Sequence, residues 1–158
     1  MNRKDTVWIG ADPGGKGNFG LAILRSDHTA QTWCLNCAEE AKELVRRELG
    51  TARPEGVGVD APLWWSSGPS SDRQADQWLR KKYRLSGGEV QTANSLRGAA
   101  IVQGMMFVQR LREIFPAVAV TETHPNAVLK ALELGVEKFF QRFSAKVSCR
   151  TKHERDKT

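Results

Sequence analysis

The hydrophobic period of the chain changes once within its first 50 residues, and this change restricts the fold to one that combines strands with helices. Residues 7–11, 19–24 and 31–35 are short apolar runs separated by turn-forming residues, which is typical of three consecutive strands. Residues 38–49 place apolar side chains three or four positions apart, with charged side chains between them, and Gly50 follows. The sequence therefore predicts three antiparallel strands with an amphipathic helix packed on them.

The rest of the chain alternates short strands with helices. Residues 57–59 and 117–120 are predicted strands, and helices are expected at residues 72–83, 94–115 and 126–134. Strands that are joined through helices can lie parallel, whereas the first three strands are joined by turns. We therefore expect an α/β fold with a mixed sheet and helices on both faces.

The length and composition fit one globular domain. The chain has 158 residues, of which 40% are hydrophobic and 27% charged, and no apolar run approaches the ~20 residues of a membrane helix. We assign residues 1–143 to this domain and residues 144–158 to a basic C-terminal tail. Three cysteines do not form a disulfide framework, and an odd number fits a reducing compartment. The sequence thus predicts a cytoplasmic protein without a membrane partner.

The net charge of +6 is concentrated near the C-terminus. Residues 142–158 contain six Lys or Arg residues and two acidic residues, so the body of the chain is nearly neutral. Basic proteins often contact phosphate backbones. The charge therefore permits a nucleic acid as partner without establishing one.

Acidic residues follow three of the predicted strands. Asp12 follows the first strand, Asp60 the fourth, and Glu122 the fifth. The carboxyl ends of strands in an open α/β sheet form the usual ligand site, so these acids can converge there. Converging carboxylates repel one another unless a cation lies between them, and oxygen ligands select Mg²⁺ or Mn²⁺, which suits phosphoryl chemistry. The alternative is that each acid is a turn or cap residue.

Four segments of the chain occur in an order that resembles a known family. These are residues 9–22, 57–63, 73–80 and 122–125, which contain the sequences IGADPGGK with FGLA, VGVDAPL, RQADQWLR and ETHP. They are similar to the signatures of an uncharacterised family of predicted nucleases in the ribonuclease H-like superfamily. The resemblance implies a ribonuclease H-like fold whose acids bind divalent metal and activate water against a phosphodiester.

The same resemblance assigns roles to the acids. Asp12 would bridge the metals, and Asp60 and Glu122 would complete the ligand set. Members of the superfamily usually place a further Asp at the start of a C-terminal helix, and Asp156 resembles it, but the chain ends at Thr158. Either the chain is truncated or its metal site is incomplete. A missing last helix would expose apolar sheet surface, which predicts a homodimer.

A histidine and two tryptophans lie next to these acids. Alternation along a strand places Glu122 and His124 on one face, so His124 is a candidate catalytic proton carrier. It could equally cap the turn that follows it. Trp64 and Trp65, close to Asp60, could stack on exposed bases, but adjacent residues point to different sides. At most one of them should be a stacking platform.

The predicted helix at residues 72–83 supplies the candidate substrate-binding residues. Asp76 is spaced to pair with either Arg73 or Arg80 on one helical face. These three residues form either a solvated ion-pair face or a site where the arginines contact substrate phosphates. In the second case, the positive strip is extended by Lys81, Lys82 and Arg84. Lys16, in the Gly-rich turn after the first strand, is a further candidate for substrate binding.

Two other motifs compete with this interpretation. Residues 10–17 nearly match a phosphate-binding P-loop, but Gly17 replaces the hydroxyl residue that binds magnesium, and a strand follows instead of a helix. Actin-like phosphotransferases hold ATP with a similar hairpin but need two such domains. Cys34 and Cys37 have the spacing of half a zinc site, and the chain contains no second pair.

The leading prediction is a metal-dependent nuclease that uses Mg²⁺ or Mn²⁺ and acts on RNA or DNA. The first alternative is a nucleic-acid-binding or interaction domain that keeps the fold but lacks a complete site. The second alternative, an actin-like ATP-dependent phosphotransferase, fits a chain of this length less well.

Overall fold

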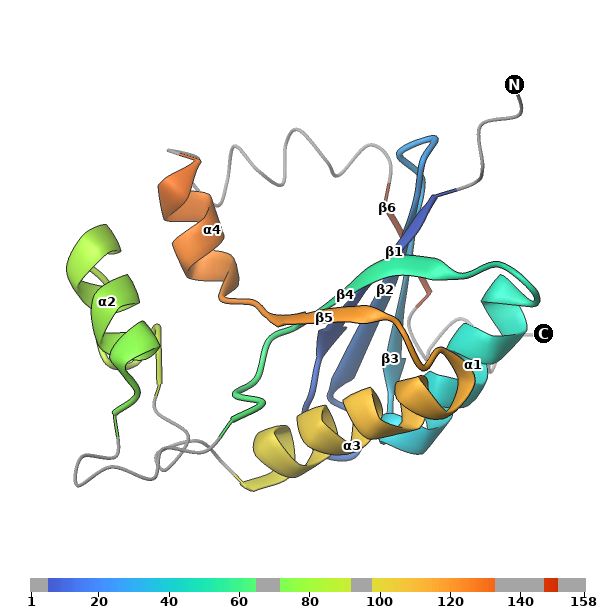
Figure 1. The fold of residues 1–158 in the computed structure, drawn as a ribbon, viewed down its shortest axis with the longest axis horizontal. Coiled ribbons are helices and arrows are strands. Elements are labelled where there is room, and N and C mark those ends of the chain that lie inside the picture. The colour runs from blue at the N-terminus through green and yellow to red at the C-terminus, as the bar shows by residue number, and fades with distance from the viewer. Residues whose placement is uncertain (1–5, 65–71, 92–97, 133–146, 151–158) are drawn as a thin grey trace.

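A computed structural model describes residues 6–64, 72–91, 98–132 and 147–150 (Figure 1). Its elements are β1 (Val7–Asp12), β2 (Phe19–Arg25), β3 (Ala30–Leu35), α1 (Ala38–Leu49), β4 (Pro54–Val59), α2 (Gln74–Tyr83), α3 (Gly98–Ile114), β5 (Ala119–Glu122), α4 (Pro125–Ala131) and β6 (Val147–Arg150). The strands form one sheet in the order β5-β4-β1-β2-β3-β6. Strands β1 to β3 pair antiparallel, whereas β4, β5 and β6 pair parallel to β1, β4 and β3. The predicted α/β fold with a mixed sheet is confirmed.

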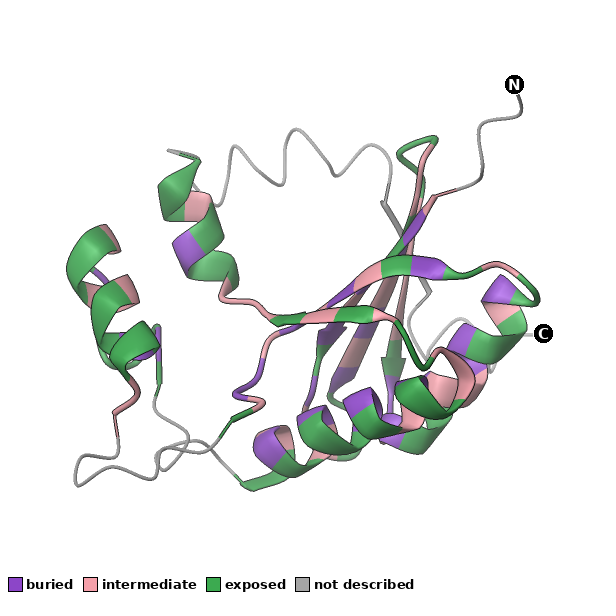
Figure 2. Cartoon of the chain, viewed as in Figure 1, coloured by how far each residue is buried: buried purple, intermediate pink, exposed green. Residues whose placement is uncertain are grey.

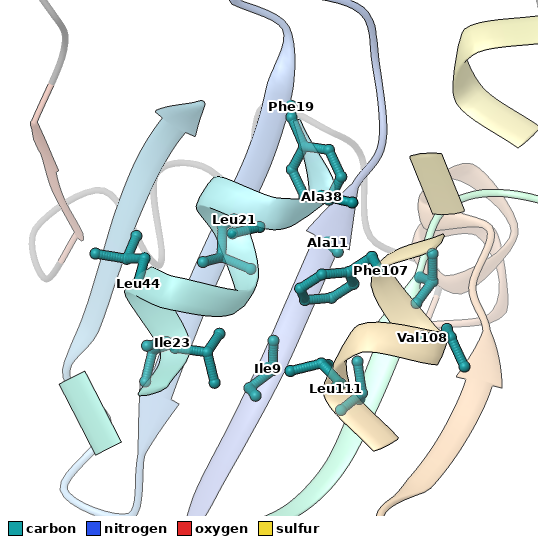
Figure 3. Close-up of a cluster of buried hydrophobic side chains, with 14 of the residues drawn as sticks. Ile9, Ala11, Phe19, Leu21, Ile23, Ala38, Leu44, Phe107, Val108 and Leu111 are labelled. Carbon is teal, nitrogen blue, oxygen red and sulfur yellow. The ribbon is translucent and has the colours of Figure 1, made fainter. Parts of the chain in front are cut away.

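One face of this sheet carries the hydrophobic core. Along β1, Val7 and Ile9 are buried while Trp8 between them is exposed, which is the two-residue period that strand geometry imposes. Helices α1 and α3 cover the buried face (Figure 2). Between them and the sheet, Phe19 of β2 meets Phe107 of α3 edge to face, with ring centroids 5.4 Å apart (Figure 3). The core therefore fixes β1 and β4 against α3.

The other face of the sheet is largely uncovered in the part of the chain that the structure describes. Trp8 of β1 and Leu24 of β2, on this face, remain exposed. Helices α2 and α4 pack against each other beyond the end of β5 instead of lying along the face (Figure 1). The prediction of helices on both faces is thus confirmed for one face. The predicted homodimer, which would use the open face, stays a prediction.

The segment predicted as a basic tail contributes a strand to the sheet. In β6, Val147–Arg150 pairs in parallel with the beginning of β3 and lies at the sheet edge opposite to β5. The other elements agree in order with the prediction, but β5 spans Ala119–Glu122 instead of residues 117–120. No helix among the described residues is long and apolar enough to cross a membrane.

Candidate functional site

Asp12 and Asp60 lie next to each other at the carboxyl ends of two parallel strands. Asp12 is the last residue of β1, and Asp60 directly follows β4. Ala11 is in register with Val59, and the Asp60 backbone N–H donates to the Ala11 carbonyl at 2.8 Å. When two residues are paired across neighbouring strands, the next residue on each strand points to the same face of the sheet, and here these next residues are Asp12 and Asp60. Both carboxyl groups therefore belong to the open face, and both line the same two cavities.

The two carboxyl groups influence each other electrostatically. Burial and, to a smaller extent, the negative charge of Asp12 raise the pKa of Asp60 to about 6. Burial also raises the pKa of Asp12. No Lys or Arg among the described residues lines either cavity, so no described cationic side chain there offsets the repulsion. A divalent cation bound between such carboxylates would offset it.

Helix α3 holds the two turns that carry these acids. Gly104 of α3 faces Ala61 and Pro13, which follow Asp60 and Asp12 in the sequence. A Cβ atom at position 104 would lie 3.0 Å from the Ala61 Cβ and 3.4 Å from the Pro13 Cγ. The helix comes this close because residue 104 has no side chain. Packing of α3 therefore supports the two turns that carry the acids.

Two cavities, of about 210 Å³ and about 370 Å³, open at the aspartate pair. The smaller one extends towards the turn after α2, where Glu89 and Gln91 line it, and towards His124. The larger one extends along the open face over Gly10 and Gly58. The pair therefore lies where two accessible cavities meet.

His124 lines the smaller cavity with the aspartates, whereas Glu122 lines a cavity on the other face. The prediction that the two share a face is therefore wrong, because β5 ends at Glu122 and strand alternation does not extend to residue 124. His124 immediately precedes α4, but within the described residues its side chain makes no capping hydrogen bond to this helix. Burial lowers the pKa of His124, against the opposing effect of the Asp76 and Glu122 charges. The imidazole is therefore neutral near pH 7 and can take up a proton.

Glu122 lies on the opposite face of the sheet from the aspartate pair. It is in register with Val59, whose side chain is buried in the core, and it lines a different cavity together with residues of α3. Its Oε1 accepts hydrogen bonds from the Leu63 backbone N–H and from Nη1 of Arg73, both at 2.6 Å. The structure thus divides the three predicted acids into a pair, Asp12 and Asp60, and a separate Glu122.

Three residues that the sequence did not single out line the aspartate cavities. Thr123 follows Glu122 and takes the open face; its Cγ2 would lie 2.7 Å from a Cβ at Gly58. Side chains along a strand alternate between the two faces of the sheet, so the position of Thr123 on the open face could have been predicted if the register of β5 had been known. Glu89 and Gln91 belong to an irregular turn, and no sequence signal places them near the aspartates.

Arg73 is a buried bridge between two acids. Its Nε and Nη2 donate to Oδ2 and Oδ1 of Asp76 at 2.8 and 2.7 Å, and its Nη1 donates to Glu122. The Asp76 side chain is fully buried, and that of Arg73 is 12% exposed. Asp76 and then Glu122 raise the pKa of Arg73, which stays charged. Of the two alternatives left open by the sequence, the structure shows an ion pair, and it is buried instead of solvated.

The remaining predicted site residues lie away from the aspartate pair. Arg80 forms an ion pair with Asp72, and its Nη1 donates to the Val90 carbonyl at 2.8 Å. Lys16 is exposed in the turn between β1 and β2 and lines neither aspartate cavity. Asp156 lies outside the described residues.

The competing motifs have a structural explanation. The Gly-rich turn joins two antiparallel strands, as expected for a segment that is not a P-loop. Cys34 and Cys37 are free thiols, and the Cys34 thiol donates to the Gly17 carbonyl at 2.8 Å. Among the described residues, no group of three or more His, Cys, Asp and Glu side chains could hold a metal ion. A cation at the aspartate pair would therefore need further ligands from water or substrate.

Asp60→Asn is expected to stabilise the protein at neutral pH. The folded-state pKa of about 6 exceeds the ordinary value of 3.8. The folded protein therefore binds this proton more tightly than the unfolded chain does, and stability falls as the pH rises from about 4 to about 6. Asparagine carries no charge, so the stability of the variant does not fall through ionisation of residue 60. Thermal unfolding at pH 4.5 and 7.5 should show a gain in Tm over wild type that grows with pH, and a gain independent of pH would contradict the assignment.

Comparison of the chain with protein-family models finds no match, and the comparisons with curated proteins and with solved structures find none either. The geometry of the aspartate pair and its surroundings is therefore what indicates the function of the chain.

Proposed function

We propose that the chain is a metal-dependent nuclease that hydrolyses phosphodiesters with Mg²⁺ or Mn²⁺ held by Asp12 and Asp60. The observation that carries this proposal is the pair of neighbouring carboxyl groups with raised pKa values at the ends of β1 and β4. Carboxyl groups perturbed in this way and located in a cavity are typical of functional sites. The mixed sheet also agrees with the fold that the sequence resemblance implies.

The chemistry of the donor set suits the proposed cation. Mg²⁺ usually binds proteins through one or two carboxylates and keeps water and substrate phosphates as its other ligands. Two aspartates are therefore enough, even though Glu122 points to the other face. When bound, the cation would stabilise charge that develops on phosphate oxygens and lower the pKa of water.

Other residues would act around this pair. His124 is neutral and lines the same cavity as Asp12 and Asp60, so it can accept a proton during hydrolysis or return it. Glu122 would act indirectly, since its contact with the Leu63 backbone fixes the segment that follows Asp60. In this proposal, Glu122 positions the site without binding the metal.

Calorimetric titration tests the metal site without knowledge of the substrate. Wild-type protein is expected to bind Mn²⁺ saturably, and Asp12→Asn is expected to weaken this binding by at least about tenfold because it removes a ligand charge. Binding should be tighter at pH 7.5 than at pH 5.5, since Asp60 must lose its proton first. Asp27→Asn, in the exposed turn between β2 and β3, is the matched control. Equal Mn²⁺ affinity in wild type and Asp12→Asn would contradict the proposal.

A non-catalytic nucleic-acid-binding domain is the second candidate function. The observation in its favour is that the described residues bring two carboxylates together and direct Glu122 elsewhere. Such a domain would bind nucleic acid with an affinity that falls steeply with salt, and it would release no product. Product formation in the presence of Mn²⁺ separates the two candidates.

A further inference from the structure

Helix α2 carries cationic and aromatic side chains on its exposed surface near its C-terminal end. Lys81, Lys82 and Arg84 are exposed, and Trp78 is 54% exposed. The Nζ of Lys82 lies 4.4 Å from the centroid of the Trp78 ring, and Tyr83 meets Trp78 edge to face. We call Trp78, Lys81, Lys82 and Arg84 the α2 basic surface.

The charges of the α2 basic surface have no acidic partners among the described residues. Several cations elsewhere in the described residues do have acidic partners: Arg73 and Arg80 contact acids, and Lys42 contacts acids on its own helix. No ion pair is formed by Lys81, Lys82 or Arg84 within the described part of the chain. Neighbouring like charges repel, so this surface is complementary to an anion.

Capping of α2 explains only part of this arrangement. Cations in the last turn of a helix interact favourably with its dipole, which accounts for Lys81 and Lys82. Arg84, however, has a left-handed backbone with φ of 52° and ψ of 47°. Glycine is the usual residue at this position because it adopts this conformation without strain. Glycine would form the same cap without strain, so capping does not explain an arginine at this position, and its exposed charge points to a binding role.

The α2 basic surface is connected to the aspartate pair by packing. Leu79 and Tyr83 of α2 pack against a small buried cluster that includes Ala127 of α4, the helix that begins directly after His124. The turn that follows Arg84 carries Gly88, Glu89 and Gln91, which line the smaller aspartate cavity. Figure 1 shows α2 and α4 together beyond the end of β5. The turn that follows Arg84 therefore joins the α2 basic surface to the wall of the smaller aspartate cavity.

We propose that the α2 basic surface binds single-stranded nucleic acid and delivers it to the aspartate pair. Lys81, Lys82 and Arg84 would contact successive phosphates, and Trp78 would stack on a base. Stacking requires an unpaired base, which is why a single strand is favoured over a duplex. This inference extends the proposed nuclease function by naming its substrate class and the residues that bind it. It also replaces Arg73 and Arg80, whose guanidinium groups are held by acids, as the phosphate-binding residues.

Binding of fluorescein-labelled 20-nucleotide strands in EDTA tests this inference independently of cleavage. Anisotropy would be measured with single-stranded DNA, single-stranded RNA and duplex DNA, and with polyglutamate as a competitor without bases. Wild type should bind a single strand more tightly than the duplex, and polyglutamate should compete poorly. The variant that tests the charges is Lys81→Ala/Lys82→Ala/Arg84→Gly. It should lose at least about tenfold in affinity, and the slope of log K against log salt should fall by about 2.

Two further variants separate binding from folding. Arg84→Gly relieves the left-handed strain, so its Tm should rise while its affinity falls. Trp78→Ala should weaken single-strand binding about tenfold, and Trp78→Phe should keep most of it, because a ring remains for stacking. The charge-matched control is Arg46→Ala/Arg47→Ala/Arg53→Ala, which alters exposed residues of α1 and the loop after it.

Each outcome decides the proposal. The proposal would be overturned by any of three results. These are an undiminished affinity for the single strand in the α2 triple variant, an equal loss of affinity in the control variant, and effective competition by polyglutamate. Tighter binding of the duplex would overturn the stacking role of Trp78. If wild type binds no single strand in EDTA, the inference fails, whereas the Mn²⁺ titration still decides the proposed nuclease function.

Discussion

Asp12→Asn and Asp60→Asn are each expected to lower Mg²⁺- or Mn²⁺-dependent cleavage of nucleic acid by about a hundredfold to a thousandfold. Each variant removes one of the two carboxylates that the cation needs, and the loss of electrostatic stabilisation of a developing charge typically has this magnitude. The measurement is the initial rate of cleavage of labelled single-stranded DNA and RNA, with Mn²⁺ varied up to saturation. Higher Mn²⁺ should not restore the rate, since the charge is missing from the site.

Loss of folding cannot explain this result if the site is assigned correctly. Asp60→Asn is expected to be more stable than wild type at neutral pH. In the wild-type protein, burial raises the pKa of the Asp60 carboxyl to about 6, so the folded state disfavours its charged form. A variant that is more stable yet inactive identifies a residue whose charge is kept for function. Asp27→Asn serves as the control, since an asparagine oxygen can still accept the hydrogen bonds that Asp27 receives from Thr29. Cleavage at the wild-type rate by purified Asp12→Asn would refute the assignment.

The strand and helix patterns predicted most of the described fold, because burial on one face imposes its period on the sequence. The bounds of β3 and α1 agree closely with the predicted ranges. The last strand, β6, could not be predicted in this way. Val147 is followed by Ser148, Cys149 and Arg150, and the strand pairs with the beginning of β3, far earlier in the chain. Pairing between distant segments leaves no local pattern that would reveal it.

The candidate site could be predicted only where it depends on strand ends. Asp12 and Asp60 directly follow strands that the hydrophobic pattern identifies, and their neighbouring positions follow from parallel pairing. The face occupied by Glu122 depends on the register of β5 with β4, because the side-chain direction reverses with every residue. The partner of Asp76 depends on how α2 packs, since the spacing alone allowed either Arg73 or Arg80.

Arg73→Met is expected to destabilise the protein by about 3 to 5 kcal/mol, a larger effect than that of any surface substitution. Arg73 donates to Asp76, which is fully buried, and to Glu122, which is 18% exposed. Removing the guanidinium leaves two carboxylates without their cation, and methionine keeps only the apolar stem. The measurement is the free energy of unfolding by urea at pH 7. Arg46→Ala, which breaks an exposed pair with Glu43, is the control and should cost about 1 kcal/mol or less.

A double variant shows whether the loss comes from the unpaired charge or from altered packing. Arg73→Met/Asp76→Leu removes the buried carboxylate together with its partner, so it should be more stable than Arg73→Met alone. If packing of α2 were the cause, the second substitution would add to the loss.

Cleavage gives an independent readout. Arg73 holds Glu122, and Glu122 holds the Leu63 backbone three residues after Asp60, so the double variant should remain folded but lose activity through a displaced Asp60. An Arg73→Met protein as stable as Arg46→Ala would show that this buried bridge does not support the site.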